Sequence, residues 1–142
     1  MEVKVSESDL GRYAQEITAG EHTLTADESV EDGGNDLGPS PYDFLLAALG
    51  SCTSITLRMY SERKQIPLKK AIVRLSYEKV YAEDCADCES TNSKMDHIDR
   101  QIELHGDLTE DQRKELLEIA NKCPVHRSLT SEILITTQLV ED

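Results

Sequence analysis

The residues of this chain best suited to do chemistry are its four cysteines, Cys52, Cys85, Cys88 and Cys123. A thiolate is both a nucleophile and a metal ligand, so the surroundings of each cysteine indicate which of these roles it could take. The four fall into three settings: a long apolar stretch, an acidic loop, and a Cys-Pro pair.

Cys52 lies in the most apolar stretch of the chain, which has no charged side chain between Asp43 and Arg58. A free cysteine in such a stretch is typical of core packing, where it behaves as a small hydrophobe. The neighbouring residues 51, 53, 54 and 56 all carry hydroxyl groups, which a purely apolar core would not need. Position favours packing, whereas the hydroxyl-rich surroundings favour function.

Cys123 directly precedes Pro124, and proline is common at the first position of a helix. The sequence therefore predicts Cys123 as an N-cap, where backbone N–H groups and the helix dipole lower the pKa of a thiol. Lys122, His126 and Arg127 add positive charge nearby. Serine or aspartate is the usual N-cap, so a cysteine here favours a functional role.

Cys85 and Cys88 form a C-x-x-C pair in the segment DCADCE. Acidic neighbours raise the pKa of a thiol, so metal binding ranks above redox catalysis for this pair. A structural zinc ion needs four ligands; His97 could be the third, and Asp84 or Asp87 could supply an oxygen. The alternative, two unremarkable thiols in a polar loop, stays open.

A helix is expected from Pro41 to about Lys64. Ser40 and Asp43 have the spacing of a capping box, and Pro67 cannot continue the helix. Its first two-thirds is apolar nearly all round, which indicates burial on more than one face and makes a second subunit a reasonable expectation.

The remaining elements are predicted from hydrophobic alternation and capping signals. Two or three short antiparallel strands fill the first 28 residues, and longer strands are expected at 69–82, 97–105 and 132–140. A capping box at Thr109 and Gln112 begins a helix that runs to about Lys122. The order of elements indicates an α+β fold with antiparallel strands and one central helix.

The chain has 142 residues and a formal net charge of −13. We interpret it as a single domain, residues 1–142, whose negative surface disfavours nucleic acids and anionic membranes as partners. The N-terminal residues MEVKVSESDLGRY lack the features of a secretion signal, so we expect a cytoplasmic location where thiols stay reduced.

The segment GPSPYDFLLAALGSCTSITLRMY, followed much later by KCPVHRSL, resembles the OsmC/Ohr family of osmotically inducible and organic hydroperoxide resistance proteins. The shared pattern is a proline-led central helix with a small-residue stretch ending in cysteine, and a later Cys-Pro. The match looks closest to the branch labelled as redox proteins.

The resemblance implies an intertwined homodimer with active sites at the subunit interface. Cys52 would be the peroxidatic thiolate that attacks an organic hydroperoxide. Cys123 would be the resolving thiol that forms a disulfide with oxidised Cys52, and a small dithiol or a thiol protein would reduce that disulfide. No metal, flavin or haem is required.

The chain departs from the family pattern at the start of the helix. Family peroxidases have a glutamate directly after the proline, whereas Pro41 is followed by Tyr42, with Asp43 one place further. The family also holds its thiolate with an arginine from the N-terminal strands, and Arg12 is the arginine before the helix. We therefore consider Arg12, Tyr42, Asp43 and His126 as residues that position substrate or thiolate.

Two alternatives to a cysteine-based peroxidase stay open from the sequence. One is a non-catalytic member of the same fold that binds a ligand, with zinc at Cys85 and Cys88; the missing glutamate favours it. The other is a cysteine hydrolase, but the chain has no G-x-S-x-G motif to support it.

Overall fold

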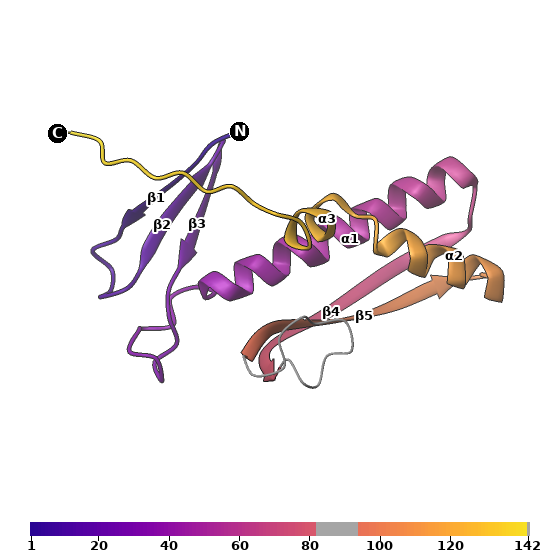
Figure 1. The fold of residues 1–142 in the computed structure, drawn as a ribbon, viewed down its shortest axis with the longest axis horizontal. Coiled ribbons are helices and arrows are strands. Elements are labelled where there is room, and N and C mark those ends of the chain that lie inside the picture. The colour runs from indigo at the N-terminus through magenta and orange to yellow at the C-terminus, as the bar shows by residue number, and fades with distance from the viewer. Residues whose placement is uncertain (82–93, 142) are drawn as a thin grey trace. The chain divides into compact units, whose positions relative to one another are not determined.

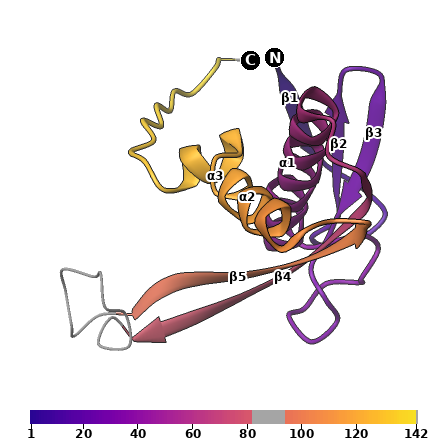
Figure 2. The same cartoon turned by 90° about the vertical axis from the view of Figure 1, so that its right-hand side faces the viewer.

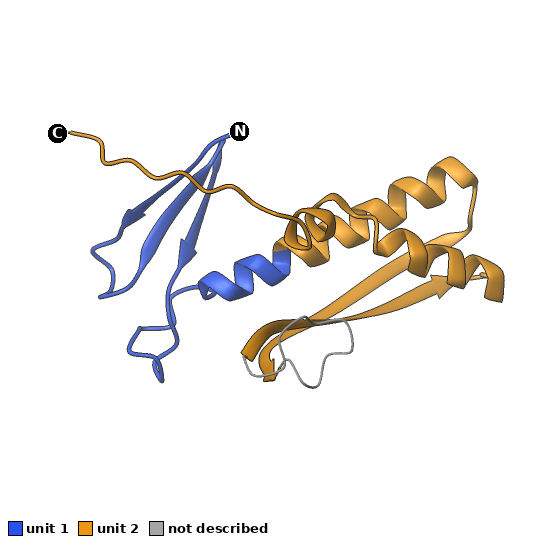
Figure 3. Cartoon of the chain, viewed as in Figure 1, with its two compact units in different colours: residues 1–47 blue, residues 48–142 orange. Residues whose placement is uncertain are grey.

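The computed structural model describes residues 1–81 and 94–141. The chain forms two compact units, Met1–Ala47 and Ala48–Asp142 (Figure 3). The boundary falls within one helix, α1, which begins in the first unit and continues into the second.

The N-terminal unit contains a three-stranded antiparallel sheet of β1 (Val3–Glu7), β2 (Gln15–Ala19) and β3 (His22–Ala26), in that order. These are the short antiparallel strands expected from the alternation. In the loop that follows, the buried carboxylate of Asp27 accepts hydrogen bonds from three backbone N–H groups, those of residues 28, 35 and 37. That single side chain gives the glycine-rich loop a defined shape.

Helix α1 (Pro41–Lys64) begins and ends where the sequence predicts. The Ser40 backbone N–H donates to Asp43 Oδ2 at 2.9 Å and the Asp43 N–H donates to Ser40 Oγ at 3.2 Å, which is a reciprocal capping box. At the other end, Gln65 adopts a positive φ of 56° and the Ile66 N–H reaches back to Ser61 O. This is a Schellman cap, and the chain then turns into the next strand.

The C-terminal unit is built on a long antiparallel hairpin of β4 (Leu68–Tyr81) and β5 (Lys94–Gly106). A register shift between Leu68 and Lys70 inserts one extra residue, so that Leu75 pairs with Arg100 further along. Strand β5 starts three residues earlier than predicted because its pairing with β4 extends that far.

Helix α2 (Glu110–Ala120) has the capping box predicted at Thr109 and Gln112, and α3 (Pro124–Leu129) has Cys123 as its N-cap. The part of α1 that belongs to this unit and α2 lie side by side over one face of the hairpin (Figures 1 and 2). Between them is an apolar core, whose fully packed members are Leu57, Ile66, Leu68, Leu116 and Ala120.

The strand predicted at 132–140 is wrong for this chain taken alone. Residues 132–141 have no assigned secondary structure, and Leu134, Leu139 and Val140 are more than 80% exposed. The alternation of the segment suits a strand, but no neighbouring strand pairs with it in the described part of the chain. In the same described residues, each helix is too short or too polar to cross a membrane.

Candidate thiol site

Helix α1 brings Cys52 and Thr53 close to the hairpin. Gly50 allows this approach, because a Cβ at that position would lie 2.7 Å from a methyl group of Leu75 on β4. Thr53 is fully buried and Cys52, next along the helix, is partly exposed. The two neighbours therefore share one location but differ in their access to solvent.

Cys123 lies where the chain leaves α2 and enters α3. Helix α2 ends at Ala120, and the Cys123 side chain caps α3 by accepting a hydrogen bond from the His126 backbone N–H at 3.3 Å. The thiol is fully buried. The Cys52 side chain is close enough to contribute to the lowered pKa of Cys123, so the two thiols belong to one site.

Arg100 of β5 connects the elements of this site. Its Nη1 donates to Thr53 Oγ1 at 3.0 Å and lies 4.0 Å from Cys123 Sγ. Its Nη2 lies 2.9 Å from Asn121 Oδ1 and 3.0 Å from His126 Nδ1. One guanidinium thus contacts α1, the link between α2 and α3, and α3 itself.

Thr53 couples the helix backbone to the buried sulfur. Its hydroxyl donates to Leu49 O at 2.7 Å and lies 3.7 Å from Cys123 Sγ. A hydroxyl has one proton to donate. While the Thr53 hydroxyl donates that proton to Leu49 O, the Cys123 thiol must be the donor of the Thr53–Cys123 contact. When Cys123 is ionised, the same hydroxyl can turn its proton to the sulfur instead.

The surroundings of Cys123 favour its thiolate. Burial raises the pKa of this thiol, but hydrogen bonds from the His126 N–H, Thr53 and Cys52, together with the charge of Arg100, outweigh burial and lower the pKa below its ordinary value. Burial, followed by the Arg100 charge, lowers the pKa of His126. A neutral His126 can accept the Arg100 hydrogen bond at Nδ1.

The arrangement has the features of a redox-active dithiol. Two thiols share one site, one is partly exposed, and the other is buried beside a cation. Such a pair can attack an electrophile, form a disulfide and be reduced again. Among the described residues, no group of three or more histidine, cysteine or acidic side chains is arranged to hold a metal ion.

A family model described as OsmC-like protein matches residues 33–138. This chain belongs to the OsmC-like family. The match includes both cysteines of the site and most of the α+β fold, as the two cysteine motifs suggested.

Solved structures agree on the fold of this OsmC-like protein. An OsmC-like protein from Mycoplasma pneumoniae is 17% identical with a TM-score of 0.70, and the alignment covers 90% of this chain and 85% of that one. An organic hydroperoxide resistance protein OsmC from Legionella pneumophila is 18% identical with a TM-score of 0.64, and the alignment covers 90% of this chain and 87% of that one. OhrB of Bacillus subtilis, an organic hydroperoxide resistance protein, is 15% identical with a TM-score of 0.61, and the alignment covers 91% of this chain and 89% of that one. A comparison with curated protein sequences finds no match.

Three of the predicted positioning residues lie in the N-terminal unit. The Arg12 guanidinium stacks on the Tyr13 ring, 4.8 Å from its centroid. Tyr42, half exposed, and Asp43 line a hollow of about 800 Å³ in that unit. Asp43 serves as the capping partner of Ser40, and the roles of Arg12 and Tyr42 toward a thiolate stay predictions.

His126 is the predicted positioning residue that joins the cysteines, through its backbone N–H and its contact with Arg100. Of the predicted zinc ligands, Cys85 and Cys88 lie outside the described residues. His97 is 3.3 Å from Glu78 across the hairpin. The zinc site therefore stays a prediction.

Arg100 is the residue that the sequence reasoning missed. Its signal is an arginine in the apolar row of β5, where Ile98, Ile102 and Leu104 alternate with exposed polar residues. Side chains two apart in a strand share a face, so Arg100 had to lie on the inward face. A charged residue on that face needs a specific partner, and this would have been a reason to single it out.

Proposed function

We propose that this OsmC-like protein reduces organic hydroperoxides, with Cys52 as the peroxidatic thiol and Cys123 as the resolving thiol. The observation that carries the proposal is that these two side chains, from α1 and from the start of α3, belong to one site, where Cys52 contributes to the lowered pKa of Cys123 and its helix neighbour Thr53 lies 3.7 Å from Cys123 Sγ. A disulfide requires sulfurs that are already neighbours. The OsmC-like family and the names of two structural relatives support the choice of substrate.

The two thiols differ in access, which supports their assignment. Cys52 is partly exposed and can meet a hydroperoxide, whereas Cys123 is fully buried. Attack of the Cys52 sulfur on the outer peroxide oxygen breaks the O–O bond, leaving a sulfenic acid on Cys52 and an alcohol as product. Condensation with Cys123 then gives a disulfide and releases water.

A dithiol or a thiol protein would return the disulfide to two thiols, by attack of its thiolate and exchange. The proposed cycle uses sulfur chemistry alone and calls for no metal, flavin or haem. Such a cycle needs a reducing compartment, which agrees with the cytoplasmic location expected from the sequence.

The test is intact mass and peptide mapping of the reduced protein before and after one equivalent of cumene hydroperoxide. We expect a rapid loss of two hydrogens that maps to a disulfide between the Cys52 and Cys123 peptides. Cys52→Ser should consume no hydroperoxide, whereas Ser51→Ala, a change at the exposed neighbouring position, should behave as the native protein. Oxidation confined to Cys85 and Cys88, or no reaction, would contradict the proposal.

We further propose that the protein is a homodimer. Ile55 and Met59 of α1 are 58% and 65% exposed, and the apolar side chains of residues 132–141 are also uncovered. Exposed apolar groups in such numbers mark an interaction surface, and an unpaired extended segment can add to another sheet. A second copy of the chain would cover both features.

The oligomeric state can be measured by light scattering on a sizing column. We expect the mass of two chains for the native protein and of one chain for Leu134→Asp combined with Leu139→Asp. The matched control is Glu132→Asp, which changes the same segment without adding charge. A native protein that elutes with the mass of a single chain at micromolar concentration would contradict the dimer.

A further inference from the structure

Within residues 1–81 and 94–141, Arg100 is a half-buried cation without a carboxylate partner. The ion pairs of these residues join other side chains, and the groups that accept from Arg100 are a hydroxyl, an amide, a neutral imidazole and the sulfur of Cys123. A charge away from water is costly unless an opposite charge or several hydrogen bonds compensate it. The hydrogen bonds are present, and the opposite charge is still to be accounted for.

The hydrogen-bond geometry shows that the guanidinium is held by the protein. A guanidinium has five N–H donors, two on each Nη and one on Nε. Each terminal nitrogen makes two of the four contacts: Nη1 with Thr53 and Cys123, and Nη2 with Asn121 and His126. As far as the described residues go, the Nε donor alone has no acceptor, which suits a fixed positive charge better than a clamp for substrate.

Cys123 is the group positioned to supply the opposite charge. Of the described groups that contact Arg100, it alone can become an anion, and its Sγ lies 4.0 Å from Nη1. The titratable or charged groups that face it are Arg100 from β5, His126 from α3 and Cys52 from α1. Burial opposes the thiolate, and the balance of these contacts lowers the pKa of Cys123.

We propose that Arg100 is a positioning residue that keeps Cys123 as the thiolate of the pair, ready to attack the sulfur of oxidised Cys52. The attack itself rests on the proposed hydroperoxide reaction, whereas the charge on Cys123 exists before any oxidant arrives. Burial keeps the hydroperoxide from Cys123, so the partly exposed Cys52 is oxidised first. The buried Cys123 thiolate then reacts with oxidised Cys52 and not with the hydroperoxide.

Cys52 attacks the hydroperoxide, the O–O bond breaks, and the proton of the Cys52 thiol ends on the alcohol. Cys123 then gives an electron pair to the Cys52 sulfur, an S–S bond forms, the S–O bond breaks, and hydroxide leaves and becomes water by taking up the proton that Cys123 had released to solvent on ionising. The hydroperoxide gains the two electrons that the thiols lose.

The experiment is an ultraviolet titration of thiolate absorbance in a background of Cys52→Ser, Cys85→Ser and Cys88→Ser, where Cys123 is the remaining thiol. The Arg100→Gln change should move the midpoint to higher pH by about one pH unit. Arg100→Lys keeps the charge but loses the fork, so it should restore the midpoint in part. Arg74→Gln removes an equal charge from the outer face of the same hairpin and should leave the midpoint unchanged.

A second readout uses the chain with its cysteines intact. After one equivalent of cumene hydroperoxide at neutral pH, we expect disulfide formation in Arg100→Gln to be roughly tenfold slower, with a longer-lived Cys52 sulfenic acid. If Arg100→Gln does not fold by circular dichroism, Arg100→Met removes the charge with a side chain suited to the apolar inward row.

An unchanged midpoint in a folded variant that lacks the charge would overturn the proposal, leaving Arg100 a structural role alone. Because the titration uses no oxidant, it separates the two proposals. A shifted midpoint in a protein that ignores hydroperoxide would reject the proposed function while supporting the charge on Cys123. Disulfide formation that is equally fast in Arg100→Gln and native protein would reject the resolving role.

Discussion

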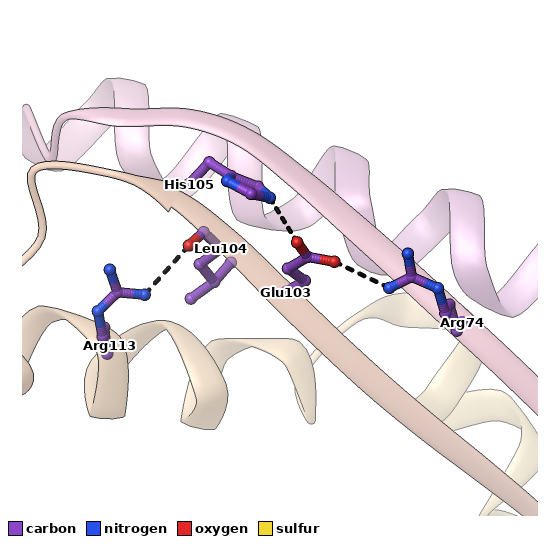
Figure 4. Close-up of polar contacts among 5 residues, drawn as sticks. All are labelled: Arg74, Glu103, Leu104, His105 and Arg113. Carbon is purple, nitrogen blue, oxygen red and sulfur yellow. Dashed lines mark hydrogen bonds and ion pairs between the residues drawn. The ribbon is translucent and has the colours of Figure 1, made fainter.

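Two arginines on adjacent strands of the same hairpin have opposite surroundings. Arg74 of β4 lies on the outer face and pairs with Glu103 at 2.9 Å, and His105 contacts the same carboxylate at 2.7 Å (Figure 4). Arg100 of β5 lies on the inner face among neutral acceptors and a sulfur. The charge of Arg74 is paired with a carboxylate at the exposed surface. The charge of Arg100 lies beside a thiol that can ionise.

The comparison shows that the partners, and not the residue type, decide what an arginine does. The side chains of Arg74 and Glu103 are 65% and 44% exposed, so solvent screens their attraction. Arg100 is half-buried, where a charge acts on a neighbouring thiol more strongly.

Removing the sulfur next to Arg100 should stop the cycle. With Cys123→Ser, the Cys52 sulfenic acid has no thiolate to attack it, so steady-state hydroperoxide turnover with a dithiol reductant should fall more than about a hundredfold. A sulfenic acid trap should label Cys52 after a single turnover. Sustained turnover in this variant would mean that the external thiol reduces Cys52 directly and that the Arg100 site is dispensable.

Loosening the core that holds the inner face should be the largest effect on stability. Leu57 is fully buried in the apolar core, and Leu57→Ala should lower the free energy of unfolding by about 2–5 kcal/mol, measured in urea. Leu117→Ala, at a 57% exposed position of α2, is the matched control and should change it far less. Equal losses would mean that burial of Leu57 in the apolar core adds nothing to the stability.

Acid should destabilise the inner face through His126. Burial and the Arg100 charge lower the pKa of His126, so the unfolded chain takes up this proton at higher pH than the folded one. The contribution of His126 to the free energy of unfolding is therefore fully present above the ordinary pKa of about 6.5. It is lost as the pH falls through the lower pKa of His126 in the folded protein.

We expect Arg100→Gln to flatten this loss, because the charge that opposes His126 protonation is gone. The measurement is the free energy of unfolding at several pH values from neutral down to about pH 5. Arg74→Gln should leave the pH dependence as in the native protein. Identical curves for the native protein and Arg100→Gln would show that Arg100 does not act on His126.

Breaking the outer pair should have the smallest effect. Glu103→Gln removes the carboxylate that Arg74 and His105 share, at an exposed position. Its free energy of unfolding and its rate of hydroperoxide consumption should both stay within the scatter of replicate native measurements. A loss comparable to that of Arg100→Gln would remove the distinction between the two faces.

Local signals in the sequence predicted most element boundaries correctly. The capping boxes at Ser40 and Thr109, the end of α1 before Pro67, and Cys123 as an N-cap each depend on residues within a few positions of one another. Backbone sterics and short-range hydrogen bonds decide such features, so the fold around them has little influence. The predicted strand at 132–140 failed because strand formation requires a partner.

Local sequence likewise identified only the part of the candidate site that lies near the two cysteines. The family motifs singled out Cys52 and Cys123, and the local sequence placed His126 beside Cys123. Nothing within a few residues of either cysteine pointed to Arg100, which meets Cys123 only because β5 crosses beneath α1 and α3. The apolar row around Arg100 was readable as a clue, but its partner was not.

By itself, the sequence determined the family, the α+β class and the two thiols. Only the tertiary structure determined that Arg100 lies beside Cys123. Continuing the Leu68–Gly106 register along the hairpin would place Arg74 directly opposite Arg100, and the one-residue shift near Lys70 places Leu75 there instead. A shift of one residue moves a side chain to the other face of a sheet, and only the assembled hairpin determines that register.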